Sequence, residues 1–369
     1  MEFILNSKEL EKLLSKVIPA VPTRTPMAVL ENFLLEIDEG KLTVYSTDLE
    51  ISLRTSMQTT AEEKIKIVVP AHLLYDVVKS LKETQIKFET ETDSKLKLTT
   101  ENGTYSLGYS SPEEFPSIPE VTADEEIKIS GKELKKAIDL TSFAISKEDM
   151  RPAMTGTLFE FTNEGINFVA TDGHRLVKLT NKKIIKKTEE QYIIPERAIN
   201  ILSKLLNEDE VIAKFSQTNV SFLIGDVEFV SRLIAEKYPA YNSVIPLENE
   251  NELKISKSEI LATIRRMSLF STTNSKQVKF SISENSLEVA AEDIDRGSSA
   301  KEKIKCEYSG EPMEIGFNTA YIHDVLTHLS DEEIVFKLHS STKACIIEPT
   351  VQKENEQLML LLMPVRLNG

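Results

Sequence analysis

Apolar and polar residues follow the same pattern in three separate parts of the chain. Each part begins with alternating apolar positions, typical of a strand, and continues with an apolar stripe at helical spacing. The three segments are MEFILNSKELEKLLSKV from residue 1, EEIKISGKELKKAIDLT from residue 125 and NELKISKSEILATIRRM from residue 251. They align without gaps, so the sequence predicts one strand-helix motif three times. The expected buried stripes are Leu10, Leu13, Leu14 and Val17, then Leu134, Ala137, Ile138 and Thr141, then Ile260, Thr263, Ile264 and Met267.

A second helix recurs at the corresponding place in each part, starting at Pro70, Pro195 and Asn318. Alternating strand patterns and turn residues lie between the two helices and again after the second one. We therefore expect an α+β fold made of three tandem copies of one β-α-β-β-β-α-β-β-β unit. Acidic, proline-containing segments separate the units, and the predicted domains are residues 1–122, 123–248 and 249–369.

The composition is that of a globular protein. Of the 369 residues, 40% are hydrophobic and 28% are charged, which suits a chain with two or three cores. No apolar run approaches the roughly 18 residues of a membrane helix, and the N-terminus lacks the pattern of a secretory signal. Cys306 and Cys345 are too few for a disulfide framework, so we expect buried thiols in a reducing cytoplasm.

The net charge of −15 argues against tight binding of nucleic acid through Lys and Arg. The six predicted helices nevertheless carry +5 together, which leaves −20 on the rest of the chain. Solvated helix faces rich in lysine would account for this difference. Alternatively, three units in series would align six mildly basic helices along one surface, which could face the DNA backbone without holding it tightly.

The chain contains none of the common nucleotide-binding or catalytic motifs. It has no GxxxxGK[ST] loop, no GxGxxG after a strand and no GxSxG elbow. Its five histidines form no HExxH motif and no Cys-His group at zinc spacing. We therefore expect no enzyme activity, no cofactor and no metal.

The segment VATDGHRLVKL, residues 169–179, raises the question of a catalytic pair. It places Asp172, His174 and Arg175 beside Gly173, and Asp with His could serve acid–base chemistry. The first unit also ends this strand in Thr-Asp, and Gly173 suits a tight turn. We therefore interpret Asp172 as structural, although a hydrolase using Asp172 and His174 stays open as an alternative.

The C-terminal segment LMLLLMPVRLNG is the other unusual stretch. We expect residues 358–362 to form a buried last strand. Met363 to Leu367 would then lie beyond the strand, where an apolar tail indicates that it lines a surface. Met is favoured at adaptable binding surfaces.

Taken together, the threefold plan, VATDGHRL, MEIGFNTAYIHDVL in the third unit and the terminal MPVRL resemble the bacterial DNA polymerase III beta subunit, the replicative sliding clamp. The resemblance covers essentially the whole chain. It implies the DNA clamp fold and a head-to-tail homodimer ring of six like domains with pseudo-sixfold symmetry. In such a ring helices line the hole around duplex DNA, and an ATP-dependent clamp loader opens and closes it.

The resemblance also implies a groove between the second and third domains that accepts short peptides rich in Gln, Leu and Phe. The expected partners are the polymerase III alpha subunit, the clamp loader, other polymerases, mismatch-repair proteins and ligase. The groove positions that match are Met154, Thr171, Gly173, His174, Arg175, Leu176, Pro239, Val244, Asn318, Tyr321, Thr342, Met363, Pro364, Val365, Arg366 and Leu367.

The chain departs from the family pattern at several positions. Ser243 and Ser275 replace an Arg and a larger apolar residue that are common in relatives, so one rim of the groove is expected to be more open. The extension Asn368-Gly369 could change peptide preference as well. For DNA contact, the resemblance points to Arg24 and Arg151, with Lys147 and Arg197 as nearby basic candidates, although Pro152 and Ala153 stand where relatives often have aromatic residues.

The ring interface is expected to join the first domain of one copy to the third domain of the other. Tyr105 and Leu107 would lie on one strand face, opposite Leu269 and Phe270, although all four could instead be ordinary core residues. A monomeric three-domain scaffold that uses the same groove without encircling DNA remains a further alternative.

Overall fold

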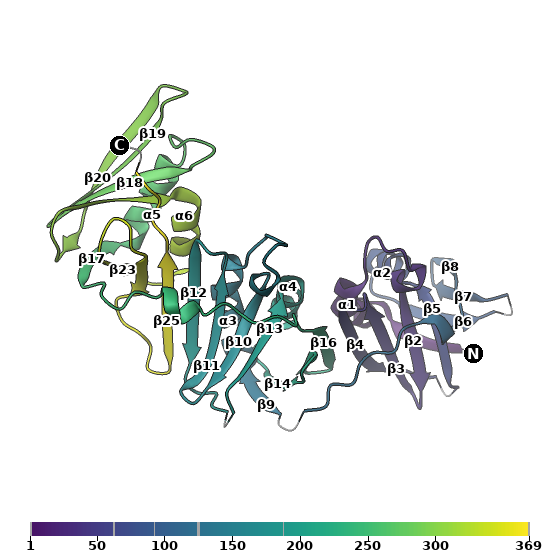
Figure 1. The fold of residues 1–369 in the computed structure, drawn as a ribbon. Helices are drawn as coiled ribbons and strands as arrows, with labels where there is room; N and C mark the ends of the chain where they lie inside the picture. Colours follow the sequence, from purple (N-terminus) through teal and green to yellow (C-terminus); the bar gives the residue numbers. More distant parts are fainter. Residues whose placement is uncertain (1, 62, 92, 124–125, 187, 368–369) are drawn as a thin grey trace. The chain divides into compact units, whose positions relative to one another are not determined.

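The computed structural model describes residues 2–61, 63–91, 93–123, 126–186 and 188–367 (Figure 1). The chain forms two compact units. The first consists of Met1–Leu134 with Asn200–Leu233, and the second of Lys135–Ile199 with Ile234–Gly369. Within the described ranges, no helix is long and apolar enough to cross a membrane.

The elements follow nearly the same order three times. The first repeat comprises β1 (Glu2–Asn6), α1 (Ser7–Val17), β2 (Asn32–Asp38), β3 (Lys41–Thr47), β4 (Ile51–Gln58), β5 (Ile65–Pro70), α2 (Ala71–Ser80), β6 (Gln85–Thr90), β7 (Lys95–Thr100) and β8 (Gly103–Gly108). The second comprises β9 (Ile127–Ser130), α3 (Gly131–Thr141), β10 (Gly156–Thr162), β11 (Gly165–Thr171), β12 (Arg175–Asn181), β13 (Glu190–Pro195), α4 (Glu196–Leu205), β14 (Glu210–Phe215), β15 (Asn219–Ile224) and β16 (Val227–Arg232). The third comprises β17 (Asn251–Ser256), α5 (Lys257–Met267), β18 (Gln277–Ser283), β19 (Ser286–Asp293), β20 (Ser298–Lys305), β21 (Glu307–Tyr308), β22 (Met313–Asn318), α6 (Thr319–His328), β23 (Glu333–Leu338), β24 (Cys345–Pro349) and β25 (Glu356–Leu362). The α+β class and the threefold repeat are therefore confirmed.

The structure has one more strand before each second helix than the predicted order, namely β5, β13 and β22, and the third repeat adds the short β21. Each of the three strands runs into its helix without a loop. Their last residues, Pro70, Pro195 and Asn318, are the positions that the sequence pattern assigned to the helices. They end the strands instead, because a residue that keeps an extended ψ can precede the first helical turn, as Asn318 does at ψ 124°.

Strands of two repeats form one continuous sheet in the first unit. Its order is β5-β2-β3-β4-β16-β15-β14-β9, so β4 of the first repeat pairs with β16 of the second. This pairing is antiparallel and places Leu53 opposite Phe229. The other sheet, β1-β6-β7-β8, belongs to the first repeat alone, and β8 is its last strand.

The second unit contains an equivalent junction. The order of its larger sheet is β13-β10-β11-β12-β25-β24-β23-β17-β21, so β12 of the second repeat pairs with β25 of the third. The pairing is antiparallel and begins with Arg175 opposite Leu362. The other sheet, β20-β19-β18-β22, ends in β20. One junction per unit therefore joins neighbouring repeats.

The predicted apolar stripes of α1, α3 and α5 are all buried. The starts of α1 and α5 are capped by the side chains of Asn6 and Ser256, residue types that favour this position. Asn6 accepts hydrogen bonds from the amides of Lys8 and Glu9, and Ser256 accepts one from Glu259. Helix α1 packs against α2, and α5 packs against α6.

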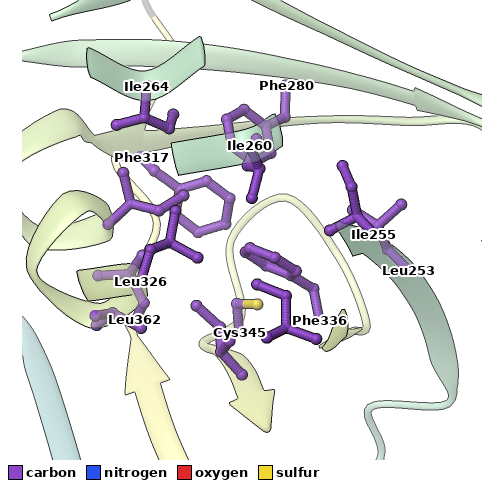
Figure 2. Packing of buried hydrophobic residues seen from close by; sticks show 14 of the residues in the cluster. Leu253, Ile255, Ile260, Ile264, Phe280, Phe317, Leu326, Phe336, Cys345 and Leu362 are labelled. Carbon is purple, nitrogen blue, oxygen red and sulfur yellow. The ribbon is translucent and has the colours of Figure 1, made fainter. Parts of the chain in front are cut away.

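The core of the third repeat surrounds Phe280, Phe317 and Phe336, which are almost fully buried (Figure 2). Leu362, at the end of β25, lies in the same cluster, so the C-terminal tail leaves directly from the core. Both cysteines are free and buried, as predicted. Burial raises the pKa of the Cys345 thiol well above its usual range, which keeps it protonated.

Candidate functional site

The loop between β11 and β12 is a tight turn organised by Asp172. Its Oδ1 atom accepts hydrogen bonds from the backbone N–H groups of His174 (2.9 Å) and Arg175 (3.0 Å). Gly173 has a φ of 87°, which favours glycine. The other oxygen, Oδ2, accepts a hydrogen bond from Arg175 Nε at 3.1 Å. Asp172 is therefore structural, as predicted, and its carboxylate is engaged by the turn rather than held for acid–base work with the His174 ring.

Arg175 joins this turn to two other elements of the second unit, and only 9% of the residue is exposed. Its Nη2 donates to the backbone oxygen of Phe143 at 2.8 Å, in the 3-10 helix Ser142–Ala144. Its Nη1 lies 2.6 Å from Oδ2 of Asp324 on α6. The guanidinium carbon lies 5.2 Å from the ring centroid of Phe143 and 4.9 Å from that of Tyr321. These contacts fix the turn relative to α6.

His174 and Tyr321 supply aromatic surface beside the turn. Their ring centroids lie 5.5 Å apart and their planes differ by 16°, so the rings stack. His174 is exposed and Tyr321 is half-buried. Partial burial and then the negative charge of Asp172 raise the pKa of Tyr321, so its hydroxyl remains able to donate a hydrogen bond. Two adjacent rings offer a large contact area at a small cost in conformational entropy.

Residues Met363–Leu367 leave β25 and pass beside the turn and β22. The backbone N–H of Met363 donates to the oxygen of His174 at 2.8 Å, and that of Val365 donates to the oxygen of Gly316 at 2.9 Å. A Cβ on Gly316 would lie 2.7 Å from the Val365 oxygen, so only glycine allows this close approach. We call His174, Tyr321 and Met363–Leu367 the tail surface.

Among the remaining groove residues suggested by the sequence, Leu176 belongs to a buried apolar cluster. Leu176 is buried in it together with Tyr238, Tyr241 and Met359. Val244, at the end of the 3-10 helix η6 (Tyr241–Val244), is 53% exposed. Met154 lies beside the turn, since its Cε is 3.7 Å from the position of a Cβ on Gly173. Asn318 caps α6, and Thr342 is exposed after β23.

The structure places the four basic residues suggested for DNA contact in different surroundings. Arg24 lies in an exposed loop of the first unit, and Arg197 lies in the first turn of α4. Lys147 forms an ion pair with Glu196. Arg151 reaches the turn, because its Nη1 would be 2.8 Å from a Cβ on Gly173. Arg151 is therefore next to the β11–β12 turn, and it is also a candidate for contact with DNA.

The four residues suggested for the ring interface differ in how exposed they are to solvent. Leu269 is 75% exposed, whereas Tyr105 is half-buried and Phe270 packs against the third core. Leu107 is only 2% exposed, because the alternation of β8 directs this side chain into its own domain. The part of Leu107 in the ring interface stays a prediction, and Leu269 is the exposed apolar side chain of the set.

Sequence reasoning missed Phe143, Asp324 and Gly316. Phe143 accepts a hydrogen bond with its backbone oxygen, and every residue type has such an oxygen, so the sequence gives no sign of this role. Asp324 lies three residues after Tyr321 on α6, a spacing that places both on one face, so this spacing could have identified it. Gly316 lies inside a strand, where a glycine indicates close approach of another backbone. In the part of the chain that the structure describes, no group of His, Cys, Asp and Glu side chains could hold a metal ion.

We predict that Gly316→Ala displaces the C-terminal tail while the fold is kept. The new methyl group would meet the Val365 backbone and the Leu367 side chain, 2.7 and 2.8 Å away. The amide of Val365 should then exchange with solvent at least about tenfold faster, since its hydrogen bond is lost. Gly108→Ala is the matched control, because nothing lies within 4 Å of its Cβ position. Unchanged exchange of the Val365 amide in Gly316→Ala would contradict the close packing of the C-terminal tail on Gly316.

Three family models match successive parts of the chain. The models of the DNA polymerase III beta subunit match residues 1–119 with the N-terminal domain, 128–240 with the central domain and 242–366 with the C-terminal domain. Among curated relatives, the Beta sliding clamps of Synechococcus elongatus and Chlamydia muridarum are 30% and 28% identical, and each match covers 100% of both chains.

Solved structures agree with these matches. A sliding clamp from Pseudomonas aeruginosa bound to griselimycin superposes with a TM-score of 0.94 at 28% identity. The DNA polymerase sliding clamp from Bacillus subtilis gives 0.94 at 25% identity, and both matches cover 100% of each chain. The chain therefore belongs to the family of the DNA polymerase III beta subunit, the DNA sliding clamps of replication.

Proposed function

We propose that this chain works as a non-enzymatic processivity factor, in which two copies close head to tail into a ring around duplex DNA. The observation that carries the proposal is the repeated junction between strands. Strand β4 pairs with β16, and β12 pairs with β25. In the third repeat the strand equivalent to β4 and β12 is β20, and in the first repeat the strand equivalent to β16 and β25 is β8.

Both of these strands end a sheet. An end strand presents unpaired backbone groups and is a ready template for pairing with another chain. If β20 of one copy pairs with β8 of a second copy, and the reverse, the same junction occurs six times around a closed ring. This supports a homodimer of three-domain subunits, with boundaries that we place at residues 1–122, 123–248 and 249–369.

For DNA, the proposal needs only weak contact. The six helices are the basic part of an acidic chain with a net charge of −15, and Arg24, Lys147, Arg151 and Arg197 are the candidate phosphate contacts. Phosphate contacts of this kind carry no base specificity. A topological link would therefore hold the ring on DNA, and an ATP-dependent clamp loader would have to open it.

For proteins, we propose that the tail surface, the 171–176 turn, the apolar cluster that contains Leu176 and the exposed Val244 form a groove for short peptides rich in Gln, Leu and Phe. Exposed rings and Met363 would anchor apolar side chains, while the buried Arg175 holds the wall rigid. Partners would be the polymerase III alpha subunit, the loader, other polymerases, mismatch-repair proteins and ligase, acting in the cytoplasm. The open rim at Ser243 and Ser275 would tune peptide preference, and Asn368-Gly369 lie outside the described residues.

We predict that the wild-type protein sediments at twice its 41.6 kDa chain mass, and that Leu269→Asp shifts it toward the monomer. An isolated charge buried at an apolar contact weakens association strongly. Leu269 is the suitable position because it is 75% exposed in the single chain, so the fold should survive. Val351→Asp, at an equally exposed position of the same repeat, is the control. A wild-type mass of one chain at micromolar concentration would support a monomeric scaffold instead of the ring.

We predict that His174→Ala weakens the binding of a labelled synthetic Gln-Leu-Ala-Leu-Phe peptide about tenfold, because it removes an exposed ring that stacks on Tyr321. Fluorescence anisotropy would report the affinity. His72→Ala, an exposed histidine of the first unit, should bind the peptide as the wild type does. Equal affinities for all three proteins would place the peptide site elsewhere.

A further inference from the structure

A row of polar side chains crosses the sheet of the second repeat at one level. Gln191, Glu160, Asn167 and Thr180 are successive cross-strand neighbours on β13, β10, β11 and β12. Gln191 Nε2 donates to Glu160 Oε1 at 2.7 Å, and Asn167 Nδ2 donates to Glu160 Oε2 at 2.8 Å. Thr180 Oγ1 in turn donates to Asn167 Oδ1 at 2.7 Å. The Glu160 carboxylate is therefore held in a fixed place by the sheet itself.

A residue of the connecting segment completes this network. The hydroxyl of Tyr241 donates to Glu160 Oε2, while its ring is buried with Leu176 and Met359. Lys178 Nζ lies 5.6 Å from the centre of the same ring. Burial and then the neighbouring Glu160 raise the pKa of Tyr241, so the hydroxyl stays protonated and keeps its donor role.

The segment that Tyr241 begins has little internal support. Helix η6 is a single 3-10 turn, Tyr241–Val244. Two backbone hydrogen bonds support it: the Ser243 amide donates to the Ala240 oxygen at 3.0 Å, and the Ile245 amide donates to the Asn242 oxygen at 3.4 Å. The residues from Asn242 to Val244 are exposed. Tyr238 before the segment and Ile245 after it pack on the same apolar cluster as Tyr241, and within residues 241–244 Tyr241 is the buried side chain. Its hydroxyl bond to Glu160 is therefore the contact that ties this turn to the polar row.

The first repeat uses the equivalent carboxylate differently. Glu36 occupies on β2 the place that Glu160 occupies on β10, and it accepts a hydrogen bond at 2.9 Å from Tyr45. Tyr45 belongs to the neighbouring strand β3 and not to a connecting segment. The same Tyr–Glu chemistry thus stabilises only a sheet in the first repeat, whereas in the second it anchors a segment that carries a groove residue.

We propose that Glu160, acting through Tyr241, is a positioning residue that holds the 239–244 wall of the peptide groove in its binding geometry. Neither side chain has to touch the peptide for this role. Loss of the hydrogen bond would let Val244 and Pro239 move, and the peptide would have to order them when it binds. The inference rests on the groove proposed above.

The test compares Tyr241→Phe with Tyr45→Phe, using the labelled Gln-Leu-Ala-Leu-Phe peptide on the full chain. Tyr241→Phe keeps the buried ring and leaves Glu160 with its bonds from Asn167 and Gln191, so the fold should be retained. We expect peptide binding about fivefold to tenfold weaker, the effect of one lost hydrogen bond to a charged group. The amides of Ser243 and Ile245 should also exchange faster. Tyr45→Phe removes the equivalent bond in the first repeat and should change neither readout.

Glu160→Ala provides a second variant, and the double variant tests whether the two residues act together. If Glu160 acts through Tyr241, the double variant should bind the peptide no more weakly than Glu160→Ala alone. Wild-type affinity in Tyr241→Phe, or an equal loss in Tyr45→Phe, would overturn the positioning role and leave the groove intact. If the wild-type protein itself does not bind the peptide, the groove is refuted, and the positioning role with it.

Discussion

Strand β12 pairs with β25 over seven residue pairs, from Arg175 opposite Leu362 to Asn181 opposite Glu356. These backbone hydrogen bonds join the second repeat to the third, and they set the position of everything at the site. The turn before β12 and the tail after β25 start from the same residue pair. They therefore lie side by side, because the antiparallel pairing brings these two strand ends together. The N–H of Met363 then donates to the oxygen of His174, which continues the pairing by one step. The proposed binding surface thus lies where a junction between repeats ends.

The charge distribution sets a second constraint, on how the protein can hold DNA. A chain with a net charge of −15 loses affinity for a polyanion unless its basic groups are concentrated at the contact. In the proposed ring the basic helices would offer weak contact, which suits movement along DNA better than tight contact does. In the ring proposed above, retention would come from closure around the duplex rather than from affinity. The end strands β8 and β20 are the strands that would pair to close it.

Much of the fold could be predicted because the signals repeat. A helical stripe such as Leu10, Leu13, Leu14 and Val17 is visible in one copy, and finding it three times removes most of the ambiguity. The strands that run directly into helices were missed, because a proline at a helix start has the same appearance whether it ends a strand or begins the helix. Local periodicity does not separate these two cases.

The site was less predictable, because its geometry depends on contacts between distant segments. The turn role of Asp172 could be inferred from the adjacent Gly173, since both signals are local. The spacing of Tyr321 and Asp324 indicates a shared face of α6, but the contact of Asp324 with Arg175 could not be inferred, because it depends on how the third repeat packs against the second.

In the function proposed above, a ring and not affinity holds this protein on DNA. The most direct measurement is its retention on primed circular duplex DNA after loading by the cognate clamp loader with ATP, before and after the circle is cut. We expect the protein to stay on the intact circle through gel filtration and to be lost when the DNA is linearised. Retention on linear DNA with free ends would contradict this expectation, because direct binding would then account for the association.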